Sequence, residues 1–477
     1  MSTEFATAGI QQLQQAMASG ALTSVALTRA YLARIDDLSV HGPHLNAVRA
    51  LDPAALGLAA TADAERAAGI VRGVLHGIPL LLKDNIDVLG MPTTAGSLAL
   101  ADSHPAADAP LVTGLTSAGA VVLGKTNLTE FANWTSEGMP SGYSSLGGQV
   151  INPYDASRTP SGSSAGSAVA AAVALAAATV GTETSGSILS PAQACSVVGV
   201  KPTVGLISRS GVVPISATQD TPGPMTRSVW DAAAVLTGLA GTDPRDPATA
   251  DNPLADVDFT AGLTGRALRG ARLGVVADDD PVFAAALTVL RARGATLVEV
   301  SVEAPTAEAI LRYEFARDLD AHLARLPAGS PVTSLAEVIA YNEAHAAAAL
   351  KFGQTLLTAS AAVDLADPDT LATYMAAREQ GLAQARAAID SVLVAHHIDA
   401  VVSASATTVV GARAGYPSVS VPAGYAAADR APVALTLLGA RWSEPRLLAL
   451  AHDYEQAARV RRSPEEINPS LFARTRL

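Results

Sequence analysis

The sequence predicts an α/β fold in one large domain, with a central sheet covered on both faces by helices. Short apolar segments typical of strands alternate with longer segments of helical periodicity, which favours a layered α/β architecture. The chain has 477 residues, enough to bury about three quarters of the surface of its unfolded form. Aromatic residues make up only 4% of the chain, so closely packed helices and strands, rather than large rings, should fill the core.

Helical periodicity comes first, at residues 5–38 and 52–69, and forms the entry to the domain. The predicted strands then follow along the chain: Ile78–Leu82, Ala120–Leu123, Val198–Val200, Ala271–Val276, Thr296–Val300, Ala400–Ser403, Ser418–Val421 and Val433–Leu438. Residues 305–395 are predicted to be almost wholly helical and to form the region of the substrate pocket. The turn-rich segment 241–256 resembles a linker, but strands are predicted on both sides of it. We therefore assign residues 1–477 to a single domain.

The charge of the chain argues against nucleic acid and anionic membranes as partners. Acidic residues outnumber basic ones, 44 to 32, which gives a net charge of −12. The single cysteine, Cys195, excludes an intramolecular disulfide, and no motif indicates a metal site or a cofactor. The apolar run Ala168–Ala178 is shorter than the ~18 residues that a membrane span needs. With no signal-like segment at Met1–Phe5, we expect a cytoplasmic protein.

Two familiar motifs match in sequence, but the structure predicted around each of them does not fit the motif's function. Gly119–Thr126 fits the Walker A pattern, yet its four variable positions are Ala-Val-Val-Leu, which predict a buried strand rather than a phosphate-binding loop. Gly162–Gly166 matches the G-x-S-x-G pattern that would make Ser164 the nucleophile of an α/β-hydrolase. That nucleophile must follow a strand directly, whereas the preceding residues 152–161 are typical of a loop. Both interpretations are therefore disfavoured.

A third arrangement consists of two Gly/Ser turns on either side of one helix. Ser161–Ser167 opens an alanine-rich helix that is predicted to run to about Ala178. A short strand, Thr179–Gly181, then leads to the second turn and a further helix in Thr182–Ala192. Helix N-termini offer unpaired backbone amides that suit a developing oxyanion. From these residues alone, a simple flexible cap is the favoured interpretation of each turn.

Lysine is rare in this chain, and one lysine follows a notably apolar segment. Only four of the 32 basic residues are lysine: Lys83, Lys125, Lys201 and Lys351. Lys83 comes directly after the apolar segment Gly77–Leu82. Burial of an amine lowers its pKa and so increases the fraction of the neutral form, which is the form that can act as a base. Arginine stays charged and cannot serve in this way. The neighbouring Asp84 should point to the opposite side of the predicted strand.

Together with Lys83, these turns resemble the amidase-signature family. The resemblance extends along nearly the whole chain and includes Leu75–Asn85, Gly124–Phe131, Gly199–Thr203, Asp220–Met225 and Gly415–Pro422. It implies a mixed, twisted sheet and an amide hydrolase with a Ser–cis-Ser–Lys triad. In that triad Ser187 would be the nucleophile, Ser163 the proton bridge after a cis peptide bond from Gly162, and Lys83 the base. The backbone amides of the second turn would form the oxyanion hole, and these belong to Thr184, Ser185, Gly186 and Ser187.

Within the family, the sequence looks most like bacterial peptide amidases, which release ammonia from amidated peptides. The similar stretches are Thr126–Trp134, Gly181–Thr184 and Pro214–Asp220. Where many members have arginine, this chain has Leu189, which disfavours substrates with a free carboxylate beside the amide. Ser185 also departs from the family pattern and places a hydroxyl beside the expected oxyanion hole.

The expected substrates are C-terminal or other neutral primary amides of peptides or acyl compounds, acted on by a monomer or homodimer. Candidate pocket residues in the helical region are Phe315, Tyr341 and Phe352, although aromatic side chains at such positions often belong to the core. Three alternatives remain open: an aryl or fatty acylamide hydrolase of the same family, a glutaminase subunit of a tRNA-dependent amidotransferase, and a catalytically silent scaffold.

Overall fold

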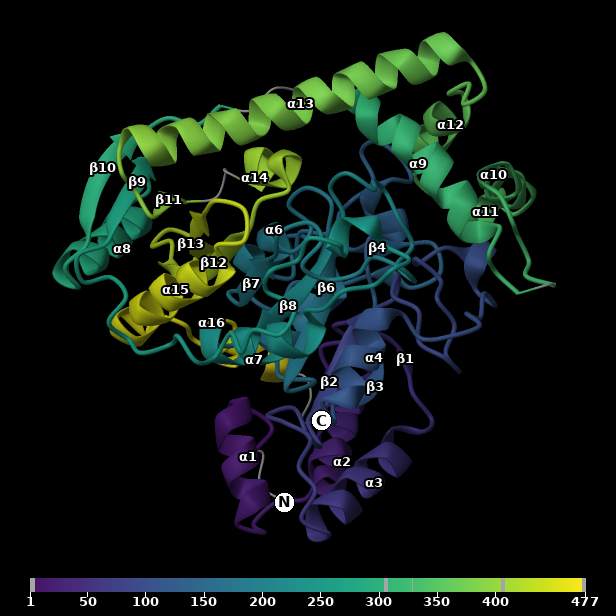
Figure 1. The fold of residues 1–477 in the computed structure, drawn as a ribbon. Coiled ribbons are helices and arrows are strands. Elements are labelled where there is room, and N and C mark those ends of the chain that lie inside the picture. The colour runs from purple at the N-terminus through teal and green to yellow at the C-terminus, as the bar shows by residue number, and fades with distance from the viewer. Residues whose placement is uncertain (1–4, 304–307, 328, 405–407, 474–477) are drawn as a thin grey trace.

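An 11-stranded sheet runs through the computed structural model, which describes residues 5–303, 308–327, 329–404 and 408–473 (Figure 1). The spatial order of the strands is β1-β3-β2-β6-β8-β7-β12-β13-β11-β9-β10. Their bounds are β1 Val48–Leu51, β2 Pro79–Lys83, β3 Val121–Thr126, β6 Ala178–Glu183, β7 Val198–Lys201, β8 Thr221–Thr226, β9 Arg272–Val276, β10 Thr296–Val300, β11 Ala400–Ser403, β12 Ser418–Tyr425 and β13 Pro432–Leu438. A separate hairpin consists of β4 Tyr143–Ser144 and β5 Gly148–Gln149. This mixed sheet, flanked by helices in a single domain, is the predicted fold class.

The sheet is parallel in two blocks and antiparallel between them. Strands β3, β2 and β6 are parallel, as are β11, β9 and β10, whereas the strands from β6 through to β11 pair in antiparallel fashion. In the first parallel block, Leu80 pairs with Ala178 and Leu82 pairs with Val180. This register brings the end of β2, at Lys83, to the level of the last residues of β6.

Helices surround the sheet and differ in length from one turn to eight. Their bounds are α1 Ile10–Ala18, α2 Ser24–Ile35, α3 Ala55–Ala67, α4 Pro110–Ser117, α5 Ala165–Ala172, α6 Leu189–Ala194, α7 Val229–Leu239, α8 Pro281–Ala292, α9 Glu308–Leu323, α10 Leu335–Ala344, α11 Ala346–Ala349, α12 Thr355–Ala361, α13 Pro368–Ala395, α14 Thr408–Ala414, α15 Glu444–Ala458, α16 Pro464–Ile467 and α17 Pro469–Phe472. Short 3-10 or π segments lie at Asp36–Val40, Leu98–Leu100, Glu130–Asn133 and Pro247–Thr249. Among the helices in the described part of the chain, none combines the length and the apolar composition that crossing a bilayer requires.

Residues 308–395 form a helical region, as predicted, although residues 304–307 and 328 are outside the described part of the chain. Its longest helix, α13, crosses one side of the molecule between the β9–β10 edge and α9 (Figure 1). The Asp367 carboxylate caps α13 by accepting hydrogen bonds from two backbone amides of its first turn, and Pro368 takes the first helical position. Helices α9, α10 and α12 share their own apolar cluster, which contains Phe131 and Phe315.

The local structure departs from the sequence prediction in several places. The helix predicted to run to about Ala178 ends at Ala172, because Ala174 adopts a positive φ of 55° and the Leu175 amide turns back to donate to the Ala170 carbonyl at 2.8 Å. The strand that follows is correspondingly longer than predicted. Strands β1 and β8 of the large sheet and the small β4–β5 hairpin were not predicted at all, yet β8 lies at the centre of the large sheet.

Candidate active site

The side chain of Lys83, the last residue of β2, is fully buried beside three oxygen atoms. Its Nζ lies 2.9 Å from Ser163 Oγ, 2.9 Å from Thr182 Oγ1 and 3.3 Å from the Thr182 carbonyl oxygen. Burial lowers the pKa of Lys83 from its ordinary 10.5 to about 7 and outweighs the opposing effect of Asp220 and Glu183. A substantial fraction of the amine is therefore neutral near neutral pH.

The neighbouring acid does not hold this amine charged. Asp84 Oδ1 instead accepts a hydrogen bond from Lys125 Nζ at 3.0 Å, in an ion pair in which both side chains are buried. Thr94 donates to the other carboxylate oxygen through its hydroxyl. Lys125 belongs to β3, so the Walker-like segment forms the buried strand that the sequence predicted. The two basic residues of this region thus have different environments, one paired with an acid and one placed against a serine.

Lys201 is the third fully buried lysine, and its contacts differ again. Burial lowers its pKa to about 8, opposed by the negative charges of Glu183 and Glu444. Its Nζ donates to the carbonyl oxygen of Pro202 at 3.1 Å. Of the three buried lysines, Lys83 is the one whose amine lies within hydrogen-bond distance of a serine hydroxyl.

The first Gly/Ser turn places Ser163 and Ser164 in different roles. The peptide bond between Gly162 and Ser163 is cis, as the resemblance implied. Ser163 directs its hydroxyl to Lys83, whereas Ser164 Oγ donates to the Thr182 carbonyl at 3.0 Å and accepts from the Thr182 amide at 3.2 Å. Because both bonds of Ser164 are made with the backbone of β6 and its side chain is fully buried, it ties the turn to the sheet.

The second turn, residues 184–187, lies directly against the first. The Ser164 amide donates to the Ser187 carbonyl at 3.1 Å, which joins the two turns. Ser187 retains 7% of its exposure, and Ser185 is exposed. Gly186 has a φ of 83°, and a Cβ there would come within 2.9 Å of Ser190 Oγ, so this position requires glycine.

Backbone amides in this turn are available to a ligand. Within the described part of the chain, no residue accepts a hydrogen bond from the amides of Ser185, Gly186 or Ser187. The next two amides are used internally, because Glu183 Oε2 accepts from Ile188 at 2.7 Å and from Leu189 at 2.9 Å. Glu183 therefore fixes the end of the turn, whereas the amides of residues 185–187 have no acceptor in the described part of the chain.

A second layer of residues holds Thr184, and their role was not evident from the sequence. Thr184 Oγ1 donates to Asp220 Oδ1 at 2.5 Å, and Gln219 Nε2 donates to the Thr184 carbonyl at 3.0 Å. Burial raises the pKa of Asp220 to about 6, against the effect of its hydrogen bonds. Asn85 Nδ2 similarly donates to Thr182 Oγ1 at 3.0 Å. The motifs 75–85 and 220–225 contained two of these residues, but sequence alone did not show what they contact.

The predicted pocket residues lie in distinct environments. Leu189 is the first residue of α6 and retains 2% of its exposure. Phe315 is fully buried in the apolar cluster of the helical region, with its ring centroid 6.2 Å from that of Phe131. Tyr341 is half-buried and stacks on His345, at 4.1 Å between ring centroids. Phe352, also half-buried, packs edge-on against Tyr143 at 4.8 Å.

A serine hydroxyl hydrogen-bonded to a buried lysine is an arrangement typical of serine hydrolases that work without histidine, and Ser163 and Lys83 have this arrangement. The chain belongs to the amidase family of hydrolases, whose sequence profile matches residues 26–448. The prediction of the amidase-signature family from sequence is confirmed.

Known relatives extend this result over the whole chain. A probable amidase of Arabidopsis thaliana is 40% identical over 480 residues, covering 96% of this chain and 92% of the plant protein. The crystal structure of native peptide amidase from Stenotrophomonas maltophilia is 46% identical, with a TM-score of 0.91 and coverage of 96% of this chain and 98% of that one. A glutamyl-tRNA(Gln) amidotransferase subunit from Chloroflexus aggregans is 42% identical over 311 residues, covering 63% of this chain and 61% of its own length. The predicted likeness to peptide amidases is therefore confirmed.

Proposed function

We propose that this amidase-family hydrolase releases ammonia from neutral primary amides at the C-terminus of peptides or of acyl compounds. The observation that carries the mechanism is the 2.9 Å hydrogen bond between Lys83 Nζ and Ser163 Oγ at a fully buried position. The substrate class is supported by the 46% identity to a peptide amidase over nearly the full length of both chains.

The contacts of Lys83 match the needs of a neutral amine. Such an amine has two N–H donors and one lone pair. In the neutral form the two donors are satisfied by Thr182, through its carbonyl and its hydroxyl, and the lone pair is left to face Ser163 Oγ, 2.9 Å away, from which it can take the hydroxyl proton. Ser163 then takes the proton of Ser187 as Ser187 Oγ attacks the carbonyl carbon of the amide.

The same route works in reverse when the amide bond breaks. Attack by Ser187 creates a tetrahedral intermediate, whose negative oxygen is stabilised by the backbone amides of the turn at residues 184–187. The proton held by Lys83 returns through Ser163 to the amide nitrogen, the C–N bond breaks, and ammonia leaves. A water molecule then attacks the acyl group on Ser187, gives its proton to the same relay and releases the acid.

Leu189 supports a preference for uncharged substrates. It lies two residues after Ser187 and is almost completely buried. A carboxylate brought next to it would find no partner there, and burying an unpaired charge costs several kcal/mol. The competing interpretation is that Leu189 only packs beneath the start of α6 and touches no substrate.

The catalytic assignment is tested by substitution and labelling. Ser187→Ala should abolish hydrolysis of a peptide amide and labelling by a fluorophosphonate, while Ser163→Ala and Lys83→Ala should each lower turnover by several orders of magnitude. Because the three residues act as one relay, the double variant Ser163→Ala/Lys83→Ala should be little worse than the poorer single variant. Full activity in Ser187→Ala, or an acyl group found on Ser164 by mass spectrometry, would overturn the assignment.

The substrate assignment is tested with matched pairs of compounds. Peptide amides, aryl amides, fatty amides and glutamine are compared first, and the highest kcat/KM should belong to a peptide amide. A neutral amide and its α-carboxylate analogue are then compared in the wild type and in Leu189→Arg. The arginine should narrow the difference between the two compounds by pairing with the carboxylate. An unchanged ratio in a folded Leu189→Arg variant would show that residue 189 does not contact the substrate.

A further inference from the structure

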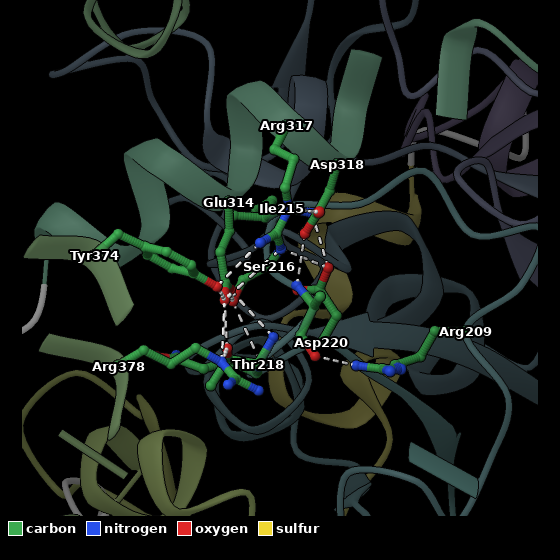
Figure 2. A network of polar contacts seen from close by, with 12 residues as sticks. Arg209, Ile215, Ser216, Thr218, Asp220, Glu314, Arg317, Asp318, Tyr374 and Arg378 are labelled. Atoms are coloured by element: carbon green, nitrogen blue, oxygen red, sulfur yellow. Dashed lines mark hydrogen bonds and ion pairs between the residues drawn. The ribbon is translucent and has the colours of Figure 1, made fainter. Parts of the chain in front are cut away.

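The carboxylate of Glu314 on α9 is fully buried, yet hydrogen-bond donors surround it (Figure 2). Its Oε2 accepts from the Ser216 hydroxyl and, at 3.1 Å, from the Thr218 amide. Its Oε1 accepts from the Thr218 hydroxyl and from Tyr374 on α13, the latter at 2.7 Å. A buried carboxylate is stable only when its lone pairs are satisfied in this way, so the network fixes Glu314 and its partners relative to one another.

Two arginines from the same helices balance the charge. Arg378 Nε on α13 lies 3.7 Å from Glu314 Oε1 and donates to Thr218 Oγ1 at 2.9 Å. Arg317 Nη2, one turn along α9, lies 4.0 Å from the same carboxylate oxygen. Both guanidinium groups are partly exposed, at 41% and 39%, so they remain hydrated while the carboxylate is not. The negative charge therefore lies at the centre of a cross-link between α9, α13 and the turn that contains Ser216.

The turn that contains Ser216 also contains the residues that contact the second Gly/Ser turn. The amide of Ser216 donates to Asp220 Oδ2 at 2.8 Å, and the Asp220 amide returns a bond of 2.9 Å to the Ser216 carbonyl. The Gln219 amide lies 3.3 Å from Ser216 Oγ. Asp220 and Gln219 are the two side chains that bind Thr184. Glu314 is thus connected to residue 184 through one buried turn, with a hydrogen bond at every step.

We propose that Glu314 is a positioning residue for amide hydrolysis. It holds residues 215–220 against α9 and thereby fixes Thr184 and the amides that follow it. This inference rests on the proposed function, because it assigns the turn at residues 184–187 to the oxyanion hole. It also explains why a helix in the predicted substrate region bears a buried acid far in sequence from the relay. Loss of the contact should misplace the oxyanion donors, which lowers kcat, while the affinity for substrate is largely retained.

The two sides of the carboxylate provide matched variants. Glu314→Gln places an NH2 group against hydrogen-bond donors and leaves buried donors without an acceptor. We expect the resulting displacement of the turn to lower kcat by roughly ten- to a hundredfold. Ser216→Ala removes one donor on the side of the catalytic turn and should lower kcat by roughly tenfold, with KM within about twofold. Tyr374→Phe removes one donor from the same carboxylate on the α13 side and preserves the stacking on Tyr313. It should leave kcat within about twofold of the wild type while lowering Tm.

A double-variant cycle separates positioning from simple loss of stability. If Glu314 acts through Asp220, then Glu314→Gln should reduce kcat when it is introduced into the wild type. The same substitution should reduce kcat hardly any further when it is introduced into the Asp220→Asn variant. Independent, multiplicative effects would overturn the inference, as would equal losses of kcat in Tyr374→Phe and Ser216→Ala. If Glu314→Gln does not fold, Ser216→Ala and its double variant with Asp220→Asn give the same comparison.

Labelling by a fluorophosphonate keeps this inference distinct from the proposed function. A folded wild type that neither reacts at Ser187 nor hydrolyses any amide refutes the proposed function and, with it, the role of Glu314. A wild type that reacts at Ser187, together with a folded Glu314→Gln variant that reacts and turns over at the same rate, refutes only the positioning role. Slower labelling and lower kcat in Glu314→Gln, with unchanged rates in Tyr374→Phe, support it.

Discussion

Replacing Lys83 with methionine should change how the stability of the protein depends on pH. The folded protein releases the Lys83 proton at a pH of about 7, whereas the unfolded chain holds it until about 10.5. Between these values unfolding takes up a proton, so the wild type becomes more stable as the pH rises through this window. Below pH 7 both states are protonated, and the full destabilising effect of burying the amine is present. Lys83→Met has no proton to exchange at this site and lacks the effect.

The size of this change in stability follows from the difference between the pKa values of Lys83 in the folded and unfolded states. Each pKa unit corresponds to about 1.4 kcal/mol, so the free energy of unfolding of the wild type relative to Lys83→Met should rise by on the order of 5 kcal/mol between pH 6 and 11. Urea unfolding of both proteins, followed by far-UV circular dichroism at intervals of one pH unit, measures this difference. Hydrogen bonds lost in the variant shift the curve by a constant and leave its slope intact. A difference that stays flat across the window would refute a depressed pKa for Lys83.

Three further outcomes are expected. The kcat/KM of the wild type should fall as the pH drops through about 7, where Lys83 takes up its proton, and the same inflection in initial rates should persist in Lys201→Met. Its disappearance in Lys201→Met would reassign the ionisation. Ser164→Ala should lower the free energy of unfolding by about 1–3 kcal/mol because buried backbone groups of β6 lose their hydrogen-bond partner. Labelling by a fluorophosphonate should persist in this variant, and its loss in a folded Ser164→Ala protein would contradict a purely structural role for Ser164. Lys125→Met should cost about 3–5 kcal/mol by leaving the buried Asp84 charge without an opposite charge, and a chemical denaturation curve that overlays the wild type would contradict this.

Sequence patterns predicted the strands well wherever apolar β-branched residues cluster. The strands Thr296–Val300 and Ala400–Ser403 have the predicted bounds. Strand β8 was missed because its sequence, Thr-Pro-Gly-Pro-Met-Thr, has the composition of a turn. It forms a central strand because β6 pairs with it over residues 221–225, whereas β7 pairs with it only at residues 225 and 226, beyond the two prolines. Long-range pairing overrode local propensity there, and no local pattern signals such an exception.

The same distinction applies to the site. The proximity of Lys83 and Ser163 was implied by the resemblance to the amidase-signature family, and the structure brings the two side chains together. The second layer around Thr184 was not predictable, because Asp220 and Glu314 reach it from different helices and turns. Their relevance depends on tertiary contacts between segments that are roughly 40 to 130 residues apart in sequence. Polar side chains in these positions resemble ordinary surface residues until the fold buries them.

The register of β2 has a consequence for how this chain tolerates insertions and deletions. β2 is paired on both sides, with β3 and β6, so its side chains alternate in fixed directions. Removing one residue between Leu80 and Lys83 would move Asp84 into the position of Lys83 and place a carboxylate in front of Ser163, whereas adding one would move Leu82 into that position. The length of this strand is therefore constrained as strictly as its residues. Libraries of variants of this chain should therefore leave the spacing of β2 and β6 untouched.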